Sequence, residues 1–532
     1  MLAALQFLSF MKQHLSSDRF TYDFCGTFPG DHSGSLKPRQ TPGVLYSEAV
    51  PTPVAKPALL AWSDELAEEL GIERPNEDDI NLLGGNLGTA NMKPYALCYA
   101  GHQFGNWAGQ LGDGRAICLG EWPVDGSSTN GSWEVQLKGA GPTAYSRRAD
   151  GRAVLRSSVR EYLMSEAMHY LGVPTTRALS LVTTGDQVVR DMFYDGRPAY
   201  EPGAIVCRTA PSFLRFGNFE MLAARNELDS LQNLVDWTIT RYYPHIQGED
   251  QVLRWFGEVV ERTASMIVEW VRVGFVHGVM NTDNMSVLGL TIDYGPYSFL
   301  DNYDPDFTPN TTDLPGRRYA FGKQANMAYW NLSCLANALV PISKDVDRLS
   351  EVLKTYEEHY WTKYYAMMGG KLGLDHVRDE DIQIFQEFES MLAAIQPDMT
   401  IFYQLLIDLP LDAQTEQEVV SYFQSSFYDD LSPEGRAQLH HLIHKYQTRR
   451  KANACTAEDA KAQMQSSNPR FVLRNYLLHQ AIEQLEKGED TLFRKLQEAI
   501  KDPYSKRFEE FFETRPGWAT EQAGCSMLSC SS

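Results

Sequence analysis

The sequence predicts an α+β fold in which a smaller, strand-rich part that carries one helix precedes a larger helical part. Residues 111–122 and 132–138 have the composition and alternation of strands around a Gly- and Ser-rich turn at 126–131. Residues 153–171 have helical periodicity and end before a Gly-Val-Pro stop signal. From about residue 211 the chain reads as mostly helical. Strands followed by a run of helices are typical of the α+β class.

The remaining elements follow in chain order from local composition. The first fifteen residues, MLAALQFLSFMKQHL, predict an amphipathic helix, and the Pro- and Gly-rich residues 18–60 predict an extended wrap. Further segments are predicted as a helix at 57–71, a Gly-rich loop at 139–152, strands at 178–193 and 203–208, loops and strands at 275–302, and charged helices at 345–510.

Composition excludes several classes of function. The chain has 532 residues, of which 43% are hydrophobic, and a formal net charge of −21. Such an acidic balance argues against a nucleic-acid binder or a protein of anionic membranes. No run of 18 apolar residues and no basic residue ahead of the N-terminal apolar stretch occur, so we expect neither a transmembrane helix nor a signal peptide. The 8 scattered cysteines include no CxxC pair, which favours a reduced, cytoplasmic location.

Lys138 and Glu161 form the first candidate constellation. Lys138 ends an alternating run, in which Glu134 and Gln136 share its face, and Glu161 lies in the helix that follows. A strand lysine held by a helix glutamate can fix an ammonium against nucleotide phosphates, as in protein kinases. The alternative, a surface lysine and an unrelated glutamate, stays open for this pair alone.

Glycines and arginines form the second group. In Gly112-Asp113-Gly114-Arg115, backbone N–H groups of a tight turn can face a phosphate, although a plain hairpin turn has the same signature. Arginines are suited to clamp a polyphosphate, and surface ion pairs are the alternative reading. The candidates from this group are Arg208 and Arg215, with Asp150 and Gly151 ahead of the long helix.

The most specific motif is HGVMNTDN at 277–284, followed by IDYG at 292–295. A kinase uses a loop Asn and an Asp-x-Gly acid to hold magnesium. Asn284 and Asp293 supply that pair of hard oxygen ligands. The usual catalytic Asp would stand five positions before Asn284, where this chain has Val279, so Asp283 is the nearest carboxylate. An Asx-rich turn and a strand end are the alternative interpretation.

Several long blocks together resemble the selenoprotein O / YdiU family. They include YAGHQFGNWAGQLGDGR, QLKGAGPTAYSR, DGRAVLRSSVREYLMSEAM, LGVPTTRALSLV, FLRFGNFE and GFVHGVMNTDNMSVLGLTIDYGP, and they lie within residues 95–330. The resemblance implies a protein-kinase-like bilobal fold whose members transfer a nucleoside monophosphate, usually AMP, to protein hydroxyls. It also implies that ATP binds reversed, with the γ-phosphate buried and the α-phosphate at the reaction point.

The resemblance assigns roles to individual residues. Asp283 is expected to accept the proton, Asn284 and Asp293 to bind Mg²⁺ or Mn²⁺, and Glu161 to hold Lys138. The expected nucleotide-binding residues are Gly112, Gly114, Arg115, Lys138, Asp150, Gly151, Arg208 and Arg215, with Asp293 contributing through the metal. Some bacterial relatives use UTP to modify Tyr or His, so UTP and UMP transfer remain an alternative to ATP and AMP transfer. Members are usually treated as monomers, and we expect a monomer here.

On this basis the chain divides into five expected segments. They are an N-terminal extension at 1–95, a kinase-like N-lobe at 96–210, a kinase-like C-lobe with the catalytic and metal loops at 211–345, a helical extension at 346–513 and a mobile tail at 514–532. Family members carry a selenocysteine or cysteine near the C-terminus, which makes Cys525 and Cys530 candidate redox residues. Because the two do not form a CxxC pair, two inert thiols are the alternative.

Two other functions compete with nucleotidyl transfer. A conventional protein phosphotransferase would move the γ-phosphoryl group, but Val279 stands where its base is expected. A catalytically inactive nucleotide-binding scaffold is the second alternative, and the retained Lys138, Asp283 and Asp293 argue against it. The leading hypothesis is therefore a metal-dependent enzyme that transfers AMP to Ser, Thr or Tyr side chains and releases pyrophosphate.

Overall fold

The structure is a computed structural model that describes residues 12–124, 131–191, 196–525 and 527–529. The chain forms two compact units, and each is described separately. The first unit consists of the described residues within Met1–Tyr162, Thr176–Asp191 and Gly196–Trp255, and the second of those within Leu163–Thr175 and Phe256–Ser532. The five segment boundaries expected from the sequence remain predictions.

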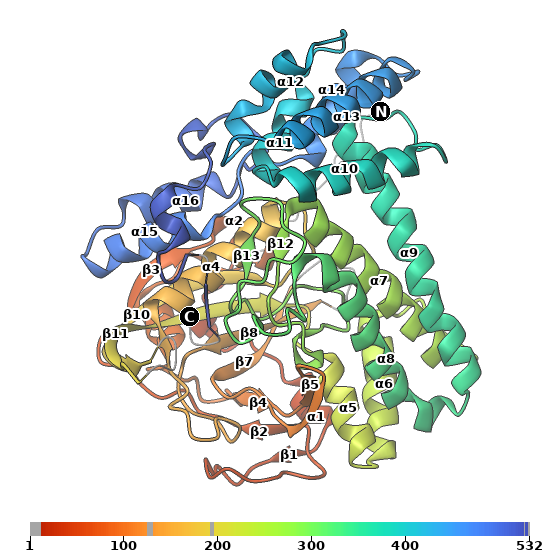
Figure 1. The fold of residues 1–532 in the computed structure, drawn as a ribbon. Coiled ribbons are helices and arrows are strands. Elements are labelled where there is room, and N and C mark those ends of the chain that lie inside the picture. Colours follow the sequence, from red (N-terminus) through yellow and green to blue (C-terminus); the bar gives the residue numbers. More distant parts are fainter. Residues whose placement is uncertain (1–11, 125–130, 192–195, 526, 530–532) are drawn as a thin grey trace, which may run out of the picture. The chain divides into compact units, whose positions relative to one another are not determined.

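A nine-stranded sheet forms the centre of the first unit (Figure 1). Its strands run in the order β1-β2-β4-β7-β8-β11-β10-β3, and β9 pairs with β11. All these pairs are antiparallel except β1 with β2. The strands are β1 (Gly30–Asp31), β2 (Tyr46–Glu48), β3 (Ala58–Trp62), β4 (Tyr95–Leu97), β7 (Ala116–Pro123), β8 (Ser132–Lys138), β9 (Ala153–Val154), β10 (Arg177–Arg190) and β11 (Ala199–Ala210), and β5 (Ala100–Gln103) and β6 (Asn106–Gln110) form a separate hairpin.

Helices accompany the sheet in the first unit and make up most of the second unit. The first unit contains α1 (Asp23–Thr27), α2 (Asp64–Leu70), α3 (Glu77–Leu83), α5 (Phe216–Ala224) and α6 (Leu228–Tyr242), while α4 (Leu155–Tyr170) and α7 (Gln251–Val273) contribute residues to both units. The second unit contains α8 (Gln324–Ser343), α9 (Val346–Leu372), α10 (Asp381–Ile395), α11 (Met399–Ile407), α12 (Glu416–Phe423), α13 (Pro433–Lys451), α14 (Ala457–Ser467), α15 (Asn475–Glu486) and α16 (Thr491–Ala499), and the short strands β12 (Phe275–Val276) and β13 (Ser298–Phe299).

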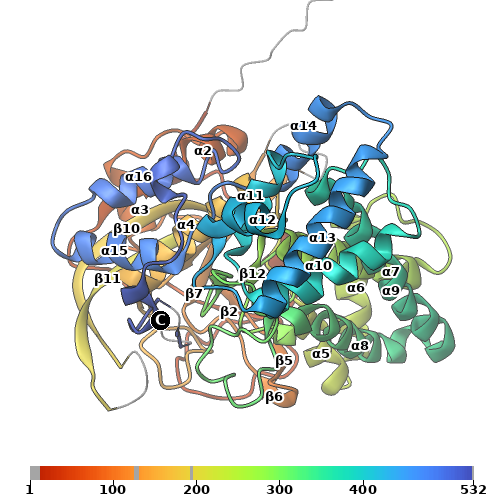
Figure 2. The same cartoon turned by 45° about the horizontal axis from the view of Figure 1, so that its top comes forward.

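Aromatic side chains form much of the core of the second unit. Phe385 and Phe388 of α10 pack in one cluster with Phe402 of α11, Phe423 of α12 and Tyr446 of α13. The rings of Phe402 and Phe423 stack with their centroids 4.7 Å apart. Helices α15 and α16 pack side by side (Figure 2). No helix of the described residues combines the length and the apolar character needed to cross a bilayer.

The α+β class and most elements are confirmed, but three segments differ in part. The wrap expected at 18–60 contains the short helix α1, and the strand expected at 111–122 begins only at Ala116. The strand predicted at 132–138 is β8, and the helix predicted at 153–171 is α4. Residues 57–71 are expected to be helical throughout, but only Asp64–Leu70 form a helix, α2, and Ala58–Trp62 form strand β3, which pairs with β10. The apolar run ALLAW fits either a helix or a buried strand, and pairing with a distant strand decided between them. The predicted helix at the extreme N-terminus and most of the turn at 126–131 lie outside the described residues.

Strand β8 is buried on both faces, so its polar residues need hydrogen-bond or ion-pair partners within the protein. It lies between β7 and β11. Glu134, Gln136 and Lys138 are all buried, and a buried polar group is costly unless it finds a partner. Glu134 accepts a hydrogen bond from the Ser212 hydroxyl at 3.0 Å. Burial, together with the neighbouring carboxylate of Glu121, raises the pKa of Glu134 to about 8.

This buried carboxyl predicts a pH-dependent stability. In the unfolded chain Glu134 ionises near its ordinary pKa of 4.5, and in the folded chain near 8. Between these values the folded state binds the extra proton, so stability falls as pH rises from 4.5 to 8. The Glu134→Gln variant should lose that dependence and gain on the order of a few kcal/mol over wild type at the upper end. Urea unfolding across this pH range measures the effect.

A matched control separates this effect from general acid–base behaviour. Glu48 is exposed, and Glu48→Gln should show the same pH dependence as wild type. If Glu134→Gln kept the wild-type dependence, the account of Glu134 would be wrong.

Candidate active site

In the first unit, Lys138 and Glu161 form the ion pair that the sequence predicts. Lys138 is the last residue of β8, and Glu161 lies in the second turn of α4. The Lys138 Nζ is 2.6 Å from Oε2 of Glu161. Both residues are buried, so the pair is shielded from water and holds the ammonium in a fixed position.

Arg208 joins the same glutamate from the neighbouring strand. Its Nη1 donates to Oε1 of Glu161 at 2.8 Å. Arg208 faces Gln136 in the β8–β11 register, and its Nη2 donates to Oε1 of that side chain. The guanidinium also lies over the ring of Phe213, 5.0 Å from the centroid. Glu161 therefore holds two cations, one on each of its oxygens.

Arg215 is linked to the same group through Asp113. The two side chains approach to 3.9 Å between Nη2 and Oδ1, and the Arg215 guanidinium lies 4.5 Å from the ring centroid of Tyr99. Asp113 also accepts a hydrogen bond from Nε2 of Gln136 at 3.3 Å. Asp113 and Gln136 thus connect the predicted cations, yet sequence reasoning did not assign either a role. The alternation that placed Gln136 on the face of Lys138 was the available signal.

The group brings together buried charges of both signs. Lys138, Arg208 and Arg215 supply three cations, and Glu161 and Asp113 supply two carboxylates. All five residues are buried, and Arg208 and Arg215 are each only 1% exposed. Buried cations can bind an anionic ligand, and arginine is well suited to phosphate oxygens. We call these five residues together with Gln136 the cation group.

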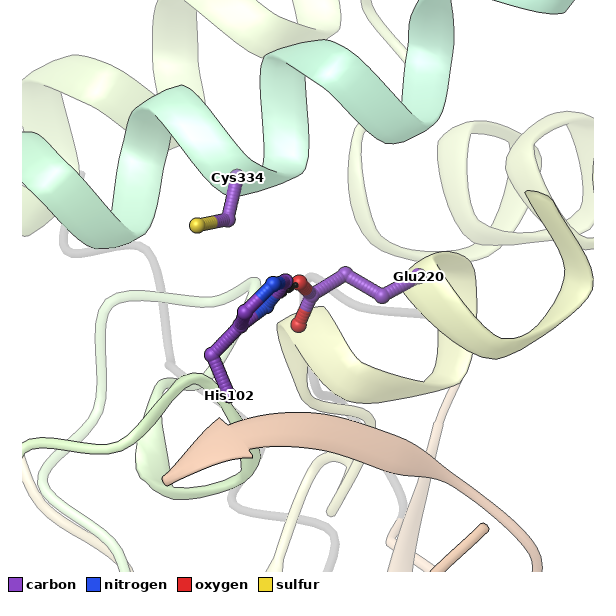
Figure 3. Close-up of side chains that lie close together, drawn as sticks. All are labelled: His102, Glu220 and Cys334. Atoms are coloured by element: carbon purple, nitrogen blue, oxygen red, sulfur yellow. Dashed lines mark hydrogen bonds and ion pairs between the residues drawn. The ribbon is translucent and has the colours of Figure 1, made fainter. Parts of the chain in front are cut away.

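Helix α5 fixes the position of Arg215, which is the N-cap residue of that helix. Glu220 of α5 binds Nδ1 of His102 in β5 at 2.6 Å, and Figure 3 shows the imidazole and the carboxylate side by side. The helix also approaches β5 so closely that a Cβ at Gly217 would lie 2.0 Å from the Ala100 carbonyl oxygen. Both contacts tie the start of α5 to the β5–β6 hairpin.

The turn Gly112–Arg115 lies between β6 and β7 and packs against residues 143–146. Gly112 has φ +139°, and a Cβ there would lie 2.5 Å from the ring of Tyr145. A Cβ at Gly114 would lie 3.1 Å from the Tyr145 carbonyl oxygen. Packing alone therefore accounts for both glycines, and Arg115 is half-buried. Their role in nucleotide binding remains a prediction.

Asp150 and Gly151 occupy a second tight turn. Gly151 has φ +68°, and a Cβ would lie 2.1 Å from the carbonyl oxygen of Gly141, so only glycine fits. Asp150 forms an ion pair with Arg190 at 2.7 Å. Partial burial would raise the pKa of Asp150, but hydrogen bonds from Arg190 and from the N–H of Arg152 lower it. The Asp150 carboxylate is therefore ionised and paired with Arg190 within the first unit. Its role in binding a nucleotide also remains a prediction.

In the second unit, the predicted catalytic and metal loops meet at a short antiparallel bridge. Met285 pairs with Thr291. Asn284 precedes this bridge and Asp293 follows it by two residues, so both predicted metal ligands stand at the same end of the turn. His277 adds a second link, because its Nε2 is 3.0 Å from the carbonyl oxygen of Ile292.

His277 acts as a neutral hydrogen-bonding group. Burial lowers its pKa, and the hydrogen bond to Ile292 and the charge of Asp293 only partly oppose this. Because the backbone N–H of Val279 donates to Nδ1 at 3.3 Å, Nε2 carries the proton and donates to Ile292. The residue that fills the usual base position, Val279, is buried and apolar.

The donor set near Asp293 fits a hard divalent cation. Nδ2 of Asn284 donates to the carbonyl oxygen of Val279 at 2.9 Å. This bond orients the amide, so its oxygen points away from Val279 and can act as an acceptor. Asp293 is half-buried and has φ +59°, a left-handed conformation that is uncommon outside glycine but that aspartate adopts more readily than most residues. Asp283 is buried in the 3₁₀ turn Thr282–Asn284. Amide and carboxylate oxygens of this kind suit Mg²⁺ or Mn²⁺.

The cysteines near the C-terminus are only partly described. Cys525 is buried, while Cys530 lies outside the described residues, so a redox pair of the two is untested. The backbone N–H of the nearby Leu528 donates to the Pro309 carbonyl at 2.8 Å. The Leu528 carbonyl accepts the backbone N–H of Thr311, also at 2.8 Å.

A groove of about 660 Å³ occurs elsewhere in the second unit, beside α7 and α9. Its walls include Tyr170, Glu269, Arg272, Lys363 and Tyr504. None of the predicted site residues lines it, so it is not the candidate site.

Comparison with known proteins gives a consistent result over nearly the whole chain. The family model described as "Protein adenylyltransferase SelO" matches residues 38–501. A relative from Cytophaga hutchinsonii, named "Protein nucleotidyltransferase YdiU", is 62% identical over 520 residues, which cover 98% of this chain and 100% of the relative. A relative of the same name from Aromatoleum aromaticum is 50% identical over 533 residues, with 98% and 100% coverage.

A solved structure gives a much weaker match. It is titled "ROP2 from Toxoplasma gondii: A virulence factor with a protein- kinase fold and no enzymatic activity" and is 12% identical, with 77% of this chain and 87% of that chain covered. Its TM-score of 0.21 is too low for this likeness to support any argument.

Proposed function

Because this chain belongs to the SelO family of protein adenylyltransferases, we propose that it is a nucleotidyltransferase that moves AMP from ATP to hydroxyl side chains of target proteins. The observation that carries the proposal is the cation group, in which three buried cations face two buried carboxylates. A pyrophosphate leaving group carries high negative charge, and buried cations that bind it offset that charge.

In the proposed reaction each residue has one task. Lys138, Arg208 and Arg215 bind the β- and γ-phosphates, with Glu161 orienting Lys138 and Arg208. Asp283 accepts the proton of the attacking hydroxyl. The oxygen forms a bond to the α-phosphorus while the bond between the α-phosphorus and the bridging oxygen breaks, and pyrophosphate departs. Gly112, Gly114, Arg115, Asp150 and Gly151 complete the predicted nucleotide contacts.

Asn284 and Asp293 are proposed to hold Mg²⁺ or Mn²⁺. When bound, a divalent ion neutralises charge on the phosphates. The donor chemistry of these two side chains and the left-handed backbone of Asp293 support this assignment. The backbone geometry positions the carboxylate, and the amide of Asn284 is oriented by its bond to Val279.

The same proposal also covers the identity of the nucleotide, the oligomeric state, the cellular compartment and the partners. The family description names adenylyl transfer, while the bacterial relatives are named nucleotidyltransferases, so UMP transfer from UTP to Tyr or His is the second candidate. We propose a monomer that acts in the cytoplasm on protein targets and binds neither nucleic acid nor membranes. The scattered cysteines, which include no CxxC pair, support a reducing compartment, and the acidic charge of the chain supports the absence of nucleic acid.

Intact-mass spectrometry tests the proposed function. The purified chain and a generic acceptor protein are incubated with Mg-ATP or with Mn-UTP. We expect a mass gain that corresponds to AMP, and a gain that corresponds to UMP would select the second candidate. A gain of one phosphoryl group would establish a conventional phosphotransferase, and no gain on either protein with any nucleotide would favour an inactive scaffold.

A further inference from the structure

The turn that carries Asp283 and Asn284 is short. It is a single 3₁₀ turn, Thr282–Asn284, preceded by Asn281 as its N-cap residue. Its backbone hydrogen bonds run from the Asn284 N–H to the Asn281 carbonyl at 3.0 Å and from the Met285 N–H to the Thr282 carbonyl at 3.4 Å. Short 3₁₀ turns have poor hydrogen-bond geometry, so a precise position for these side chains requires contacts from outside the turn.

Such contacts come from the segment that follows β13 and from α8. The side-chain amide of Asn310 donates to the Gly278 carbonyl at 3.0 Å, and that of Asn331 donates to the Met280 carbonyl at 3.0 Å. Gln324 accepts the N–H of His277 at 3.0 Å and donates to the Phe275 carbonyl at 2.9 Å. All three of these side chains are fully buried. They fix the backbone of residues 275–280, upstream of the turn.

Tyr319 makes the contact at the turn itself. Its hydroxyl donates to Oδ1 of Asn281 at 2.6 Å, and both residues are buried. An N-cap asparagine usually accepts from a backbone N–H of its own helix, but the Asn281 side chain makes no such bond. Its amide is instead oriented by a hydroxyl from a segment 38 residues away in sequence.

The position of Tyr319 is itself rigidly set. The buried carboxylate of Asp313 accepts the backbone N–H of Tyr319 at 2.8 Å, that of Arg318 at 2.9 Å, and the hydroxyl of Thr308 at 3.1 Å. A carboxylate that collects several donors holds the loop in one conformation. The phenol oxygen therefore approaches Asn281 from a fixed direction.

We propose that Tyr319 is a positioning residue, which acts through Asn281 to hold the turn with Asp283 and Asn284 in its reactive geometry. The inference rests on the proposed function, because it assumes that Asp283 accepts the proton. A small displacement of a catalytic side chain lowers the rate of the chemical step much more than it lowers nucleotide binding. The phosphate-binding cations belong to the first unit, and Tyr319 belongs to the second.

Steady-state kinetics of nucleotidyl transfer tests this role. The Tyr319→Phe variant should lower kcat by about tenfold and leave KM for the nucleotide within about twofold of wild type. The matched control is Tyr446→Phe, because the Tyr446 hydroxyl is also buried and donates to the Leu372 carbonyl at 3.0 Å. That variant should keep the wild-type kcat while losing a similar amount of thermal stability.

A double-mutant cycle shows whether Tyr319 acts through Asn281. The Asn281→Ala variant should lower kcat, and adding Tyr319→Phe to it should produce little further loss. Asn281→Asp keeps an acceptor for the phenol and should retain more activity than Asn281→Ala. Fully additive effects, or a Tyr319→Phe variant with wild-type kcat, would overturn the inference. If Tyr319→Phe does not fold, the comparison of Asn281→Asp with Asn281→Ala decides, and equal loss in both rejects it.

The same assay separates this inference from the proposed function. Asp283→Asn should abolish most transfer. If Asp283→Asn is inactive and Tyr319→Phe is unaffected, only the positioning role fails. If Asp283→Asn retains wild-type activity, Asp283 is not the proton acceptor, and the positioning role of Tyr319 fails together with that assignment.

Discussion

Replacing Asp293 by Asn is expected to lower nucleotidyl transfer by about 10³-fold, since a catalytic divalent ion contributes several kcal/mol to the stabilisation of phosphate charge. Asn keeps the size of the side chain and one oxygen, but it removes the negative charge that attracts the ion. Mn²⁺ affinity, measured by calorimetry, should fall in parallel with the rate. The variant should unfold at the same temperature as wild type in the absence of metal.

The choice of Asn for this variant follows from the backbone. Asp293 has φ +59°, a region that Asn tolerates and that alanine enters only with strain. A loss in Asp293→Asn therefore reports on charge, whereas a loss in Asp293→Ala combines charge and backbone strain. Asp306 is an exposed aspartate of the same unit, and Asp306→Asn should behave like wild type. Undiminished transfer and Mn²⁺ affinity in Asp293→Asn would show that the metal assignment is wrong.

The second large effect is expected at Lys138. Lys138→Met should lower kcat for transfer by about 10²-fold or more, because the ammonium neutralises negative charge that develops on departing pyrophosphate. Methionine preserves most of the length and apolar volume of the lysine stem. The variant should still fold, since Glu161 keeps its ion pair with Arg208 at 2.8 Å and is not left as an isolated buried charge.

Lys56→Met is the matched control for this variant. Lys56 is an exposed lysine of the same unit, so its replacement should change neither kcat nor KM. A Lys138→Met enzyme that turns over at the wild-type rate would show that the leaving group is stabilised elsewhere. Because Arg215 shares the task, the double variant Lys138→Met/Arg215→Met should be still slower, and it keeps Glu161 paired with Arg208.

Local patterns were sufficient to predict the pair at the centre of the cation group. Lys138 ends an alternating strand, Glu161 lies in a periodic helix, and the 2.6 Å contact between them confirms that the two signals belong together. The roles of Asp113 and Gln136 could not be predicted in the same way. Which residue faces Arg208 depends on the register of β8 against β11, and a one-residue shift would have presented a different side chain.

Contacts between residues far apart in the sequence could not be predicted from local patterns either. His102 and Glu220 are 118 residues apart, and Tyr319 and Asn281 are 38 residues apart. Neither pair carries a spacing that local rules recognise. The strand at Ala58–Trp62 was missed for the same reason, because its partner β10 begins more than a hundred residues later and local composition fits a helix as well. Long-range pairing, which no local pattern encodes, decided all three.

One measurement tests the central claim most directly, namely that the chain transfers the α-phosphate with its nucleoside and that the β- and γ-phosphates leave together. The chain is incubated with Mg²⁺ and ATP that carries one label on the α-phosphate and another on the γ-phosphate. The account predicts that protein retains the α-label and that the γ-label is recovered entirely in pyrophosphate. Protein that carries the γ-label, with the α-label recovered in ADP, would contradict it.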